Sequence, residues 1–190
     1  MPYSHDVMEF LLARRSRPAK MLQAPAPDGA QLDLLLTAAA RVPDHGKLEP
    51  WRFVVLETPA CTRMARTIEA RAAALGLEPE KAVKAASSFA ESQLIVAVVA
   101  RPKPSEKIPE LEQTLSAGAV CLSLVNAALA SGWGACWLSG WPAYDTEIQG
   151  ALGLAPQEWI AGFVHIGTSG ATPPERPRPD IAALTTRLQS

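Results

Sequence analysis

Three segments of the sequence carry residue types that could bind an anionic or planar ligand. The first is Arg14-Arg15-Ser16-Arg17, which closes a short amphipathic stretch near the N-terminus. A guanidinium presents a planar fork of N–H donors that matches a phosphate, and a serine hydroxyl adds another donor. The same cluster could instead be the solvated basic end of a helix, which the helix dipole favours. The segment therefore indicates either a phosphate site or an exposed helix terminus.

The second segment, residues 41–51, reads RVPDHGKLEPW. It places a histidine, a lysine and a proline–tryptophan pair in a loop directly before an expected strand. Gly46 permits close approach of the backbone to a flat or bulky group. Taken singly, His45 is more often an ordinary loop residue, and Trp51 more often belongs to a core. Their combination at this spacing favours a binding loop.

The third segment, residues 132–140, reads GWGACWLSG. Its glycines and the Ser139 hydroxyl could let backbone amides approach the polar edge of a ligand. The sequence has neither the G-x-S-x-G elbow of a serine nucleophile nor the glycine-rich loops that bind nucleotide phosphates. His5, His45 and His165 are far apart, and no Cys/His pair has the spacing of metal ligands. We therefore expect neither a metal site nor a side-chain nucleophile.

These segments must be positioned by alternating helices and strands. Asp28 and Gln31 form a capping-box pattern ahead of one helix, which should end before Pro43. Residues 94–100 (LIVAVVA) are typical of a central strand covered on both faces. The apolar periodicity predicts the other helices over 6–14, 58–75, 80–88 and 111–131, and the other strands over 52–57, 135–138 and 159–166. The pattern favours one α+β domain over residues 1–190, an α/β sandwich around a mixed sheet.

Composition excludes several classes of protein. The net charge of −1 gives no electrostatic basis for binding nucleic acid or an anionic membrane. The three cysteines show no paired spacing and are typical of buried thiols in a reducing compartment. The N-terminus has no secretory signal pattern, so we expect a cytoplasmic protein.

One uncharged stretch, residues 113–144, exceeds the roughly 20 residues that a spanning helix needs. It is only weakly apolar, so the helix over 111–131 fits a core or a subunit interface, buried on nearly all sides, better than a membrane. The proline-rich tail over 167–180 should run extended across its own surface or that of a partner. An apolar pattern over 181–188 then predicts a final anchor.

These segments together resemble the nitroreductase family. The resemblance rests on an N-terminal helix ending in RRS, a P-x-x-G-x-x-x-P-W loop leading into RFVVL, a small-residue helix ending in SGWG, and an IGT…PPERPRP tail. Within the family, RVPDHGKLEPWRF resembles a bacterial subgroup of small NAD(P)H nitroreductases with a P-D-H loop. The resemblance covers nearly the whole chain in the right order. It implies a nitroreductase-like fold, a central mixed sheet flanked by helices, and an intertwined homodimer with FMN in two interface pockets.

The resemblance also implies which residues bind the cofactor and the electron donor. The early arginines and the tail would hold the FMN phosphate and polar chain. The 41–51 loop would line the flavin, either of its own chain or of the partner subunit. The third segment would lie along the flavin near the interface between the two subunits. A stretch from Ala127 to Gly132 is linked with the pyridine nucleotide. The expected FMN contacts are Arg14, Arg15, Ser16, Arg41, His45, Trp137, Leu138, Ser139 and Arg178.

The implied activity is flavin-borne. NADH or NADPH would deliver a hydride to the flavin N5, and a nitroaromatic, a quinone or a similar electron-poor acceptor would then receive it in a ping-pong cycle. No catalytic side chain is required, although His45 could stack or hydrogen-bond at the flavin edge. Two alternatives remain: a flavoenzyme of the same fold with different chemistry, such as dehalogenation or flavin fragmentation, and a non-catalytic flavin-binding protein.

Four positions depart from the family pattern. Pro18 stands where many members have an arginine, for which Arg17 or Lys20 could compensate. Lys47 and Glu49 replace an asparagine and a glutamine, and Leu138 stands where the subgroup tends to have arginine. These changes bear on the choice of substrate rather than on flavin binding. Lys47 could stabilise negative charge on the reduced flavin.

Overall fold

The computed structural model describes residues 3–171 and 173–188, which form a five-stranded sheet between two layers of helices. The strands pair in the order β1–β5–β3–β2, and β4 also pairs with β5. The strands are Leu22–Gln23 (β1), Trp51–Glu57 (β2), Leu94–Ala100 (β3), Gly134–Leu138 (β4) and Trp159–Ser169 (β5). The α+β class expected from the sequence is confirmed.

The sheet within one chain is antiparallel rather than mixed. All four strand pairings between described residues are antiparallel. The prediction of a mixed sheet was wrong at this level because the two helices that connect β2 to β3 pack against each other and return the chain to the end of the sheet that it left. Helix α3 (Thr58–Ala74) leads away from the end of β2, and helix α4 (Pro79–Ala90) leads back to the same end, so β3 returns antiparallel.

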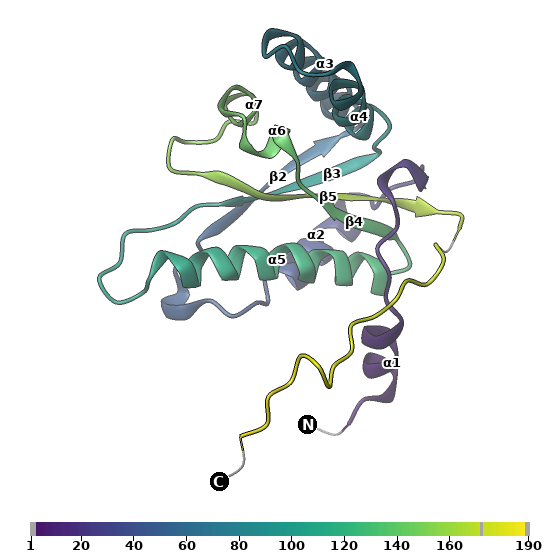
Figure 1. The fold of residues 1–190 in the computed structure, drawn as a ribbon, viewed down its shortest axis with the longest axis vertical. Helices are drawn as coiled ribbons and strands as arrows, with labels where there is room; N and C mark the ends of the chain where they lie inside the picture. Colours follow the sequence, from purple (N-terminus) through teal and green to yellow (C-terminus); the bar gives the residue numbers. More distant parts are fainter. Residues whose placement is uncertain (1–2, 172, 189–190) are drawn as a thin grey trace.

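Figure 1 shows the layers on the two faces of the sheet. Helices α3, α4, α6 (Trp141–Tyr144) and α7 (Thr146–Ala151) cover one face, and α2 (Gly29–Ala39) and α5 (Glu110–Ala130) cover the other. Strand β3 is buried along its whole length and divides its side chains between the two cores. Ile95, Ala97 and Val99 pack with α3 and α4, whereas Leu94, Val96 and Val98 pack with α2 and α5. This alternation confirms the predicted central strand.

Helix α2 begins at the predicted capping box. The Asp28 carboxylate accepts from Gln31 N at 2.9 Å, and the Gln31 side chain accepts from Asp28 N at 3.1 Å. Helix α5 matches its predicted span, but one of its faces is open in the single chain, where Leu111, Leu115 and Leu122 are 67%, 64% and 47% exposed. The prediction that this helix is buried on nearly all sides therefore holds only toward the sheet.

By length and composition alone, α5 could also cross a membrane, with 44% of its most apolar window buried inside the chain. Many buried core helices meet the same criteria.

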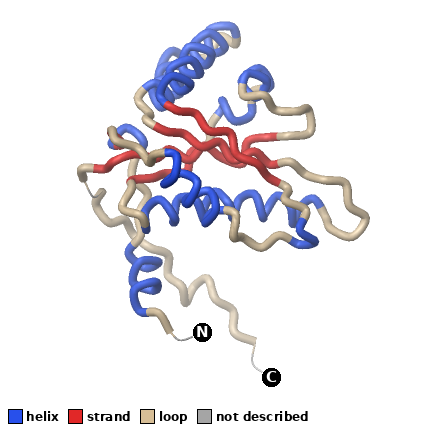
Figure 2. The backbone as a smooth tube through the Cα atoms, turned by 180° about the vertical axis from the view of Figure 1, so that it is seen from behind, coloured by secondary structure: helices blue, strands red, loops and turns tan. Residues whose placement is uncertain are grey.

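The two chain ends leave the body of the fold together. Helix α1 (His5–Ala13) buries none of its residues. The tail runs extended beside it (Figure 2), as its prolines predict, and Ile181, Leu184 and Leu188 are exposed. The apolar end of the tail therefore has no packing partner among the described residues of its own chain.

Candidate functional site

Three arginines, Arg14, Arg15 and Arg17, converge where α1 ends and β4 begins. The extended segment after Ala13 passes along the start of β4, where Arg17 N donates to the Ala135 carbonyl at 2.8 Å. A cavity of about 300 Å³ lies here, lined by Arg14, Arg15 and Arg17 and by Gly132 and Gly134. It is large enough for a phosphate and part of the chain attached to it.

The arginines of this cavity have unused donors. Arg14 Nη2 donates to Ser16 Oγ at 3.2 Å. Arg14 Nε, Arg15 Nε and Arg17 Nη1 are buried and have no hydrogen-bond partner within residues 3–171 and 173–188. Because a buried donor without a partner is costly, this set of atoms fits an anion that accepts from several of them at once.

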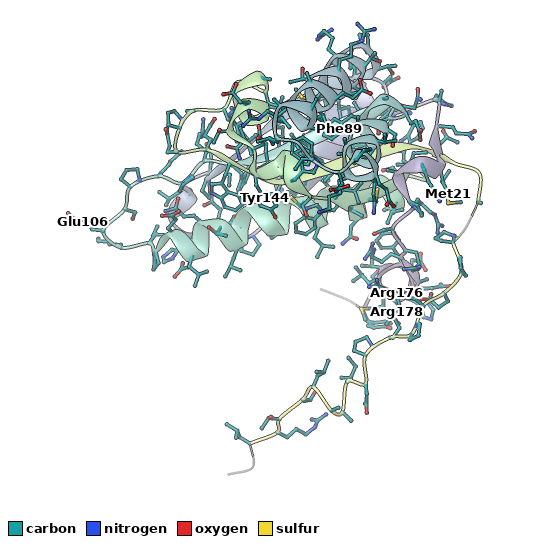
Figure 3. All side chains as sticks on the ribbon, turned by 45° about the horizontal axis from the view of Figure 1, so that its top comes forward. Met21, Phe89, Glu106, Tyr144, Arg176 and Arg178 are labelled. Carbon is teal, nitrogen blue, oxygen red and sulfur yellow. The ribbon has the colours of Figure 1, made fainter. Side chains whose placement is uncertain are left out.

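The tail adds two further cations. Arg15 Nη2 donates to the Pro174 carbonyl at 3.0 Å, and Figure 3 shows Arg176 and Arg178 on the tail beside α1. Burial and the charges of Arg178, Arg15 and Arg176 together lower the pKa of Arg14. Glu175 offsets part of this charge through an ion pair of 2.9 Å with Arg178. The structure thus brings together four predicted phosphate contacts, Arg14, Arg15, Ser16 and Arg178.

Strand β4 leads from this cavity to a second one. Among the described residues β4 pairs with β5 alone, and the bond from Arg17 shows that the main chain of Ala135 faces the edge opposite β5, where the segment after Ala13 covers its start. With the two-residue period of a strand, the main chain of Trp137 faces the same way. From Gly134 to Leu138 the strand covers about 13 Å at roughly 3.3 Å per residue.

The second cavity, of about 340 Å³, lies between α4 and residues 138–142. Phe89 and Phe163 form part of its apolar wall. Its polar residues come from α4, from the end of β4 and from β5, and they are Lys81, Lys84, Ser88, Ser139 and His165. An aromatic wall with a few polar groups is suited to a planar ring.

The predicted segment 137–139 divides its side chains between the two faces of the sheet. Leu138 pairs with Phe163 and lines the second cavity. Trp137 lies on the α5 face, where its Nε1 donates to the Ala161 carbonyl at 3.2 Å and its ring comes within 3.9 Å of a Cβ placed on Gly118. Leu138 and Ser139 therefore share the second cavity, and Trp137 does not line it.

Arg41 and His45 lie at the opposite end of α5 from the arginine cavity. His45 Nδ1 is 2.7 Å from Glu112 Oε2, in the first turn of α5, whereas Gly132 follows the last turn. With 21 residues, α5 is about 31 Å long. One chain alone therefore does not bring Arg41 or His45 to the arginines.

The His45 loop is held in a strained conformation. Gly46, Lys47 and Glu49 have φ of 70°, 53° and 48°, a region that side-chain-bearing residues seldom occupy. The Asp44 carboxylate accepts from Leu48 N and Glu49 N at 3.0 and 2.8 Å, which stabilises the turn. Strain of this kind is common in binding loops, as the sequence indicated for this segment.

Ala127 and Gly132, the two positions linked with the pyridine nucleotide, lie in different surroundings. Gly132, with φ of 83°, lines the arginine cavity. Ala127 packs against the core of the α5 layer instead.

Sequence reasoning missed His165, Lys81, Lys84 and the tail residue Arg176. The signal for His165 was a histidine inside the apolar strand WIAGFVHI, and that for Arg176 was its place in PPERPRP.

The cysteines are buried and free, as predicted. Burial raises the pKa of Cys61 and Cys136 to about 11 and that of Cys121 to about 12, so these thiols are inert at neutral pH. Within the part of the chain that the structure describes, no group of three or more His, Cys, Asp or Glu residues is arranged to hold a metal ion.

The fold is an α+β sandwich with an arginine-lined cavity at the start of β4 and an aromatic-walled cavity at its end. The chain belongs to the nitroreductase family, whose model matches residues 11–168. It is 37% identical over 163 residues to YdjA of Escherichia coli K12, a proposed NAD(P)H nitroreductase, covering 86% of this chain and 88% of that protein. A proposed NAD(P)H nitroreductase of Haemophilus influenzae is 36% identical over 164 residues, with the same coverage of 86% and 88%.

Solved structures share the fold at lower identity. A nitroreductase-like family protein from Bacillus cereus superposes with a TM-score of 0.84 at 19% identity, over 100% of both chains. A nitroreductase with bound FMN from Bacteroides fragilis has a TM-score of 0.76 at 20% identity, covering 98% of this chain and 100% of that one. These similarities establish a nitroreductase-like fold.

Proposed function

We propose that this chain is an FMN-dependent oxidoreductase that uses NADH or NADPH to reduce an electron-poor acceptor such as a nitroaromatic or a quinone. The observation that carries the proposal is the set of buried donors on Arg14, Arg15 and Arg17 that lack a hydrogen-bond partner around a phosphate-sized cavity, with Glu175 Oε1 4.0 Å from Arg15 Nε as a nearby counter-charge. The relatives named NAD(P)H nitroreductases and the FMN-bound structure of the same fold support this assignment.

The residues present fit FMN. The arginine cavity would hold its phosphate, and the open edge of β4 would carry the sugar-like chain toward Leu138 and Ser139. The separation of about 13 Å along β4 suits the distance from the phosphate of FMN to its ring system. When bound, the flavin supplies hydride chemistry, and the protein supplies binding, orientation and electrostatics.

The chain's own groups would act by positioning and by charge. Ser139 is two residues beyond Trp137 and four beyond Ala135, so its main-chain N–H would face the same side as theirs. It would donate to the polar edge of the ring. Phe89 and Phe163 would exclude water from the ring pocket.

A homodimer would complete the site. Leu111, Leu115 and Leu122 form an exposed apolar stripe along α5, and Arg41 and His45 lie at one end of this helix with the arginines at the other. If two copies pack these stripes antiparallel about a two-fold axis, the His45 loop of each copy meets the arginine cavity of the other. Leu115→Glu should then convert the dimer to a monomer in analytical ultracentrifugation and weaken FMN binding, whereas Leu34→Glu, at an exposed leucine of α2, should do neither.

The three buried free thiols support a reducing compartment, and we place the protein in the cytoplasm.

The test is anaerobic stopped-flow absorbance of the purified protein. We expect one FMN per chain, bleaching of the flavin absorbance by NADH or NADPH, and its return on addition of a nitroaromatic or quinone. A protein that takes up no added FMN would refute the proposal. Flavin that binds but is not bleached by either nucleotide would instead identify a non-catalytic flavin-binding protein.

A further inference from the structure

The tail brings one carboxylate to the arginine cavity, that of Glu175. One of its oxygens, Oε1, lies 2.9 Å from Arg178 Nη2 and accepts from Arg176 N at 2.9 Å. The same oxygen lies 4.0 Å from Arg15 Nε. Among the described residues, no other carboxylate forms an ion pair with an arginine of the cavity or of the tail. Glu175 is therefore the internal counter-charge of this cluster.

The sequence of the tail places Glu175 and Arg178 on the same side of the chain. The four prolines between positions 173 and 179 keep this segment extended. An extended proline-rich chain has about three residues per turn, so side chains three positions apart face the same way. The bond of 3.0 Å from Arg15 Nη2 to the Pro174 carbonyl then holds this part of the tail against the end of α1.

Glu175 supplies charge to the cavity but does not satisfy its buried donors. At 4.0 Å its carboxylate is beyond hydrogen-bonding distance of Arg15 Nε, which is buried without a partner among the described residues. Arg14 Nε and Arg17 Nη1 are in the same situation. A phosphate monoester carries about −1.5 to −2 charges at neutral pH and three strong acceptor oxygens. It can therefore neutralise the cluster and also bond these donors.

The Glu175 carboxylate lies on the solvent side of the arginines. Its side chain is 62% exposed, whereas the Arg15 side chain is 19% exposed. Arg178 is 45% exposed and belongs to the same extended segment. Both members of the Glu175–Arg178 pair can therefore change partners without disturbing the packing of the sheet and its helices.

We propose that Glu175 is an internal counter-anion of the arginine cavity. In the absence of phosphate it pairs with Arg178, and a phosphate group that enters the cavity takes Arg178 from it. Glu175 therefore lowers the affinity of the cavity for phosphate, and phosphate binding changes the contacts of the tail. Naming the phosphate as that of FMN rests on the proposed function, whereas the exchange of partners needs only a phosphate group.

The test compares Glu175→Gln with wild type in fluorescence titrations of the flavin-free protein. Because an exposed ion pair is weak, we expect the variant to bind FMN only about two- to fivefold more tightly. Riboflavin, which lacks the phosphate, should bind equally to both proteins. Glu9→Gln removes an exposed carboxylate from α1 and controls for net charge.

Three results of these titrations would overturn the proposal and leave the proposed function intact. They are unchanged or weaker FMN binding by Glu175→Gln, an equal gain for riboflavin, and an equal gain in Glu9→Gln.

The exchange of partners can be followed at Arg178 by NMR. Its side-chain Nε–H signal, assigned from Arg178→Lys, is recorded while inorganic phosphate is added to the flavin-free protein. We expect the signal to move in wild type, and in Glu175→Gln to start elsewhere and reach the same end point. The signal of Arg187, an exposed arginine farther along the tail, should stay in place. A wild-type Arg178 signal that does not move would overturn the proposal.

Inorganic phosphate also separates this inference from the proposed function. If FMN does not bind, the proposed function fails, and the same titration gives the Kd for phosphate in both proteins. Phosphate binding that is about two- to fivefold tighter in Glu175→Gln supports the internal counter-anion. Equal binding, or no binding by either protein, overturns it.

Discussion

Arg15 and Pro174 are joined by a hydrogen bond of 3.0 Å from the arginine Nη2 to the proline carbonyl, across 159 positions of sequence. This bond fixes the start of the tail against the end of α1. It thereby places Arg176 and Arg178 close enough to Arg14 for their charges to add to the effect of burial, which is the main cause of the lowered pKa of Arg14. Such crowding of like charges is costly without an anion, and it is one ground for our proposal that the cluster binds a phosphate.

Arg14→Ala should weaken FMN binding without destabilising the free protein. Loss of a charge-assisted hydrogen bond to phosphate costs roughly 1.5–3 kcal/mol, or about tenfold to hundredfold in Kd. The free energy of unfolding should stay the same or rise slightly, because Arg14 is repelled by its neighbours. Fluorescence titration measures the Kd, and urea denaturation measures the stability. Arg66→Ala on α3, an exposed position of the opposite layer, is the matched control and should leave the Kd unchanged.

Arg52→Ala should cost about 3 kcal/mol of unfolding free energy, because it leaves a buried carboxylate unpaired. Glu158 is 7% exposed and accepts from Arg52 Nε at 2.8 Å and Nη2 at 2.6 Å. These bonds hold the pKa of Glu158 below its usual range. Glu9→Gln removes the exposed His5–Glu9 pair and should change the stability by less than about 0.5 kcal/mol. Equal effects in urea denaturation would show that the Arg52 pair contributes no more than a surface pair.

Gly162→Ala should displace the Trp137 indole from the α5 face of the sheet. A Cβ at position 162 would overlap the Trp137 ring, which lies directly over this glycine. We expect the bond from Trp137 Nε1 to the Ala161 carbonyl to break and the protein to lose about 1–3 kcal/mol.

The indole N–H resonance of Trp137, assigned from Trp137→Phe, reports the displacement. Gly150→Ala in α7 has open space at its Cβ and should be neutral or stabilising by up to about 1 kcal/mol. An unmoved Trp137 resonance in Gly162→Ala would contradict this packing.

The parts of the fold that local chemistry dictates could be predicted from the sequence. The α2 capping box needs only Asp28 and Gln31, and the central strand needs only an apolar run of strand length. Helices α6 and α7 were missed. The sequence does carry a signal for α7, because Asp145 is its N-cap and accepts from Glu147 N and Ile148 N. The direction of strand pairing was wrong because it depends on how α3 and α4 pack on each other, which periodicity does not encode.

The candidate site also has parts that the sequence could predict and parts that it could not. The arginine cluster was predictable because its members are adjacent in sequence, and the tail joins it through the Arg15–Pro174 bond, which no local pattern reveals. The opposite placement of Trp137 and Leu138 follows from the two-residue period of a strand and could have been anticipated. The signal for His165, a histidine inside an apolar strand, was too weak to use, because such a histidine is usually a core residue. Only the bonds of Ser92 show that its Nδ1 carries the proton and its Nε2 a lone pair.

The burial of His165 should make the folded protein less stable in acid. The pKa of this ring falls from 6.5 in the unfolded chain to about 4 in the folded protein. Between these values the unfolded chain binds a proton that the native state does not, so the native state loses stability as pH falls. The contribution is fully present above pH 6.5, and about 3 kcal/mol should be lost by pH 4.

Urea denaturation across this pH range measures the loss, and His165→Phe supplies the comparison. The carboxylates of Asp145, Glu158 and Glu175 also have lowered pKa values and lose stability in acid, but they do so in both proteins. The difference between the two pH curves therefore isolates the histidine. A wild-type curve parallel to that of His165→Phe between pH 6.5 and 4 would mean that folding does not lower the pKa of His165, which would contradict the burial of a neutral ring.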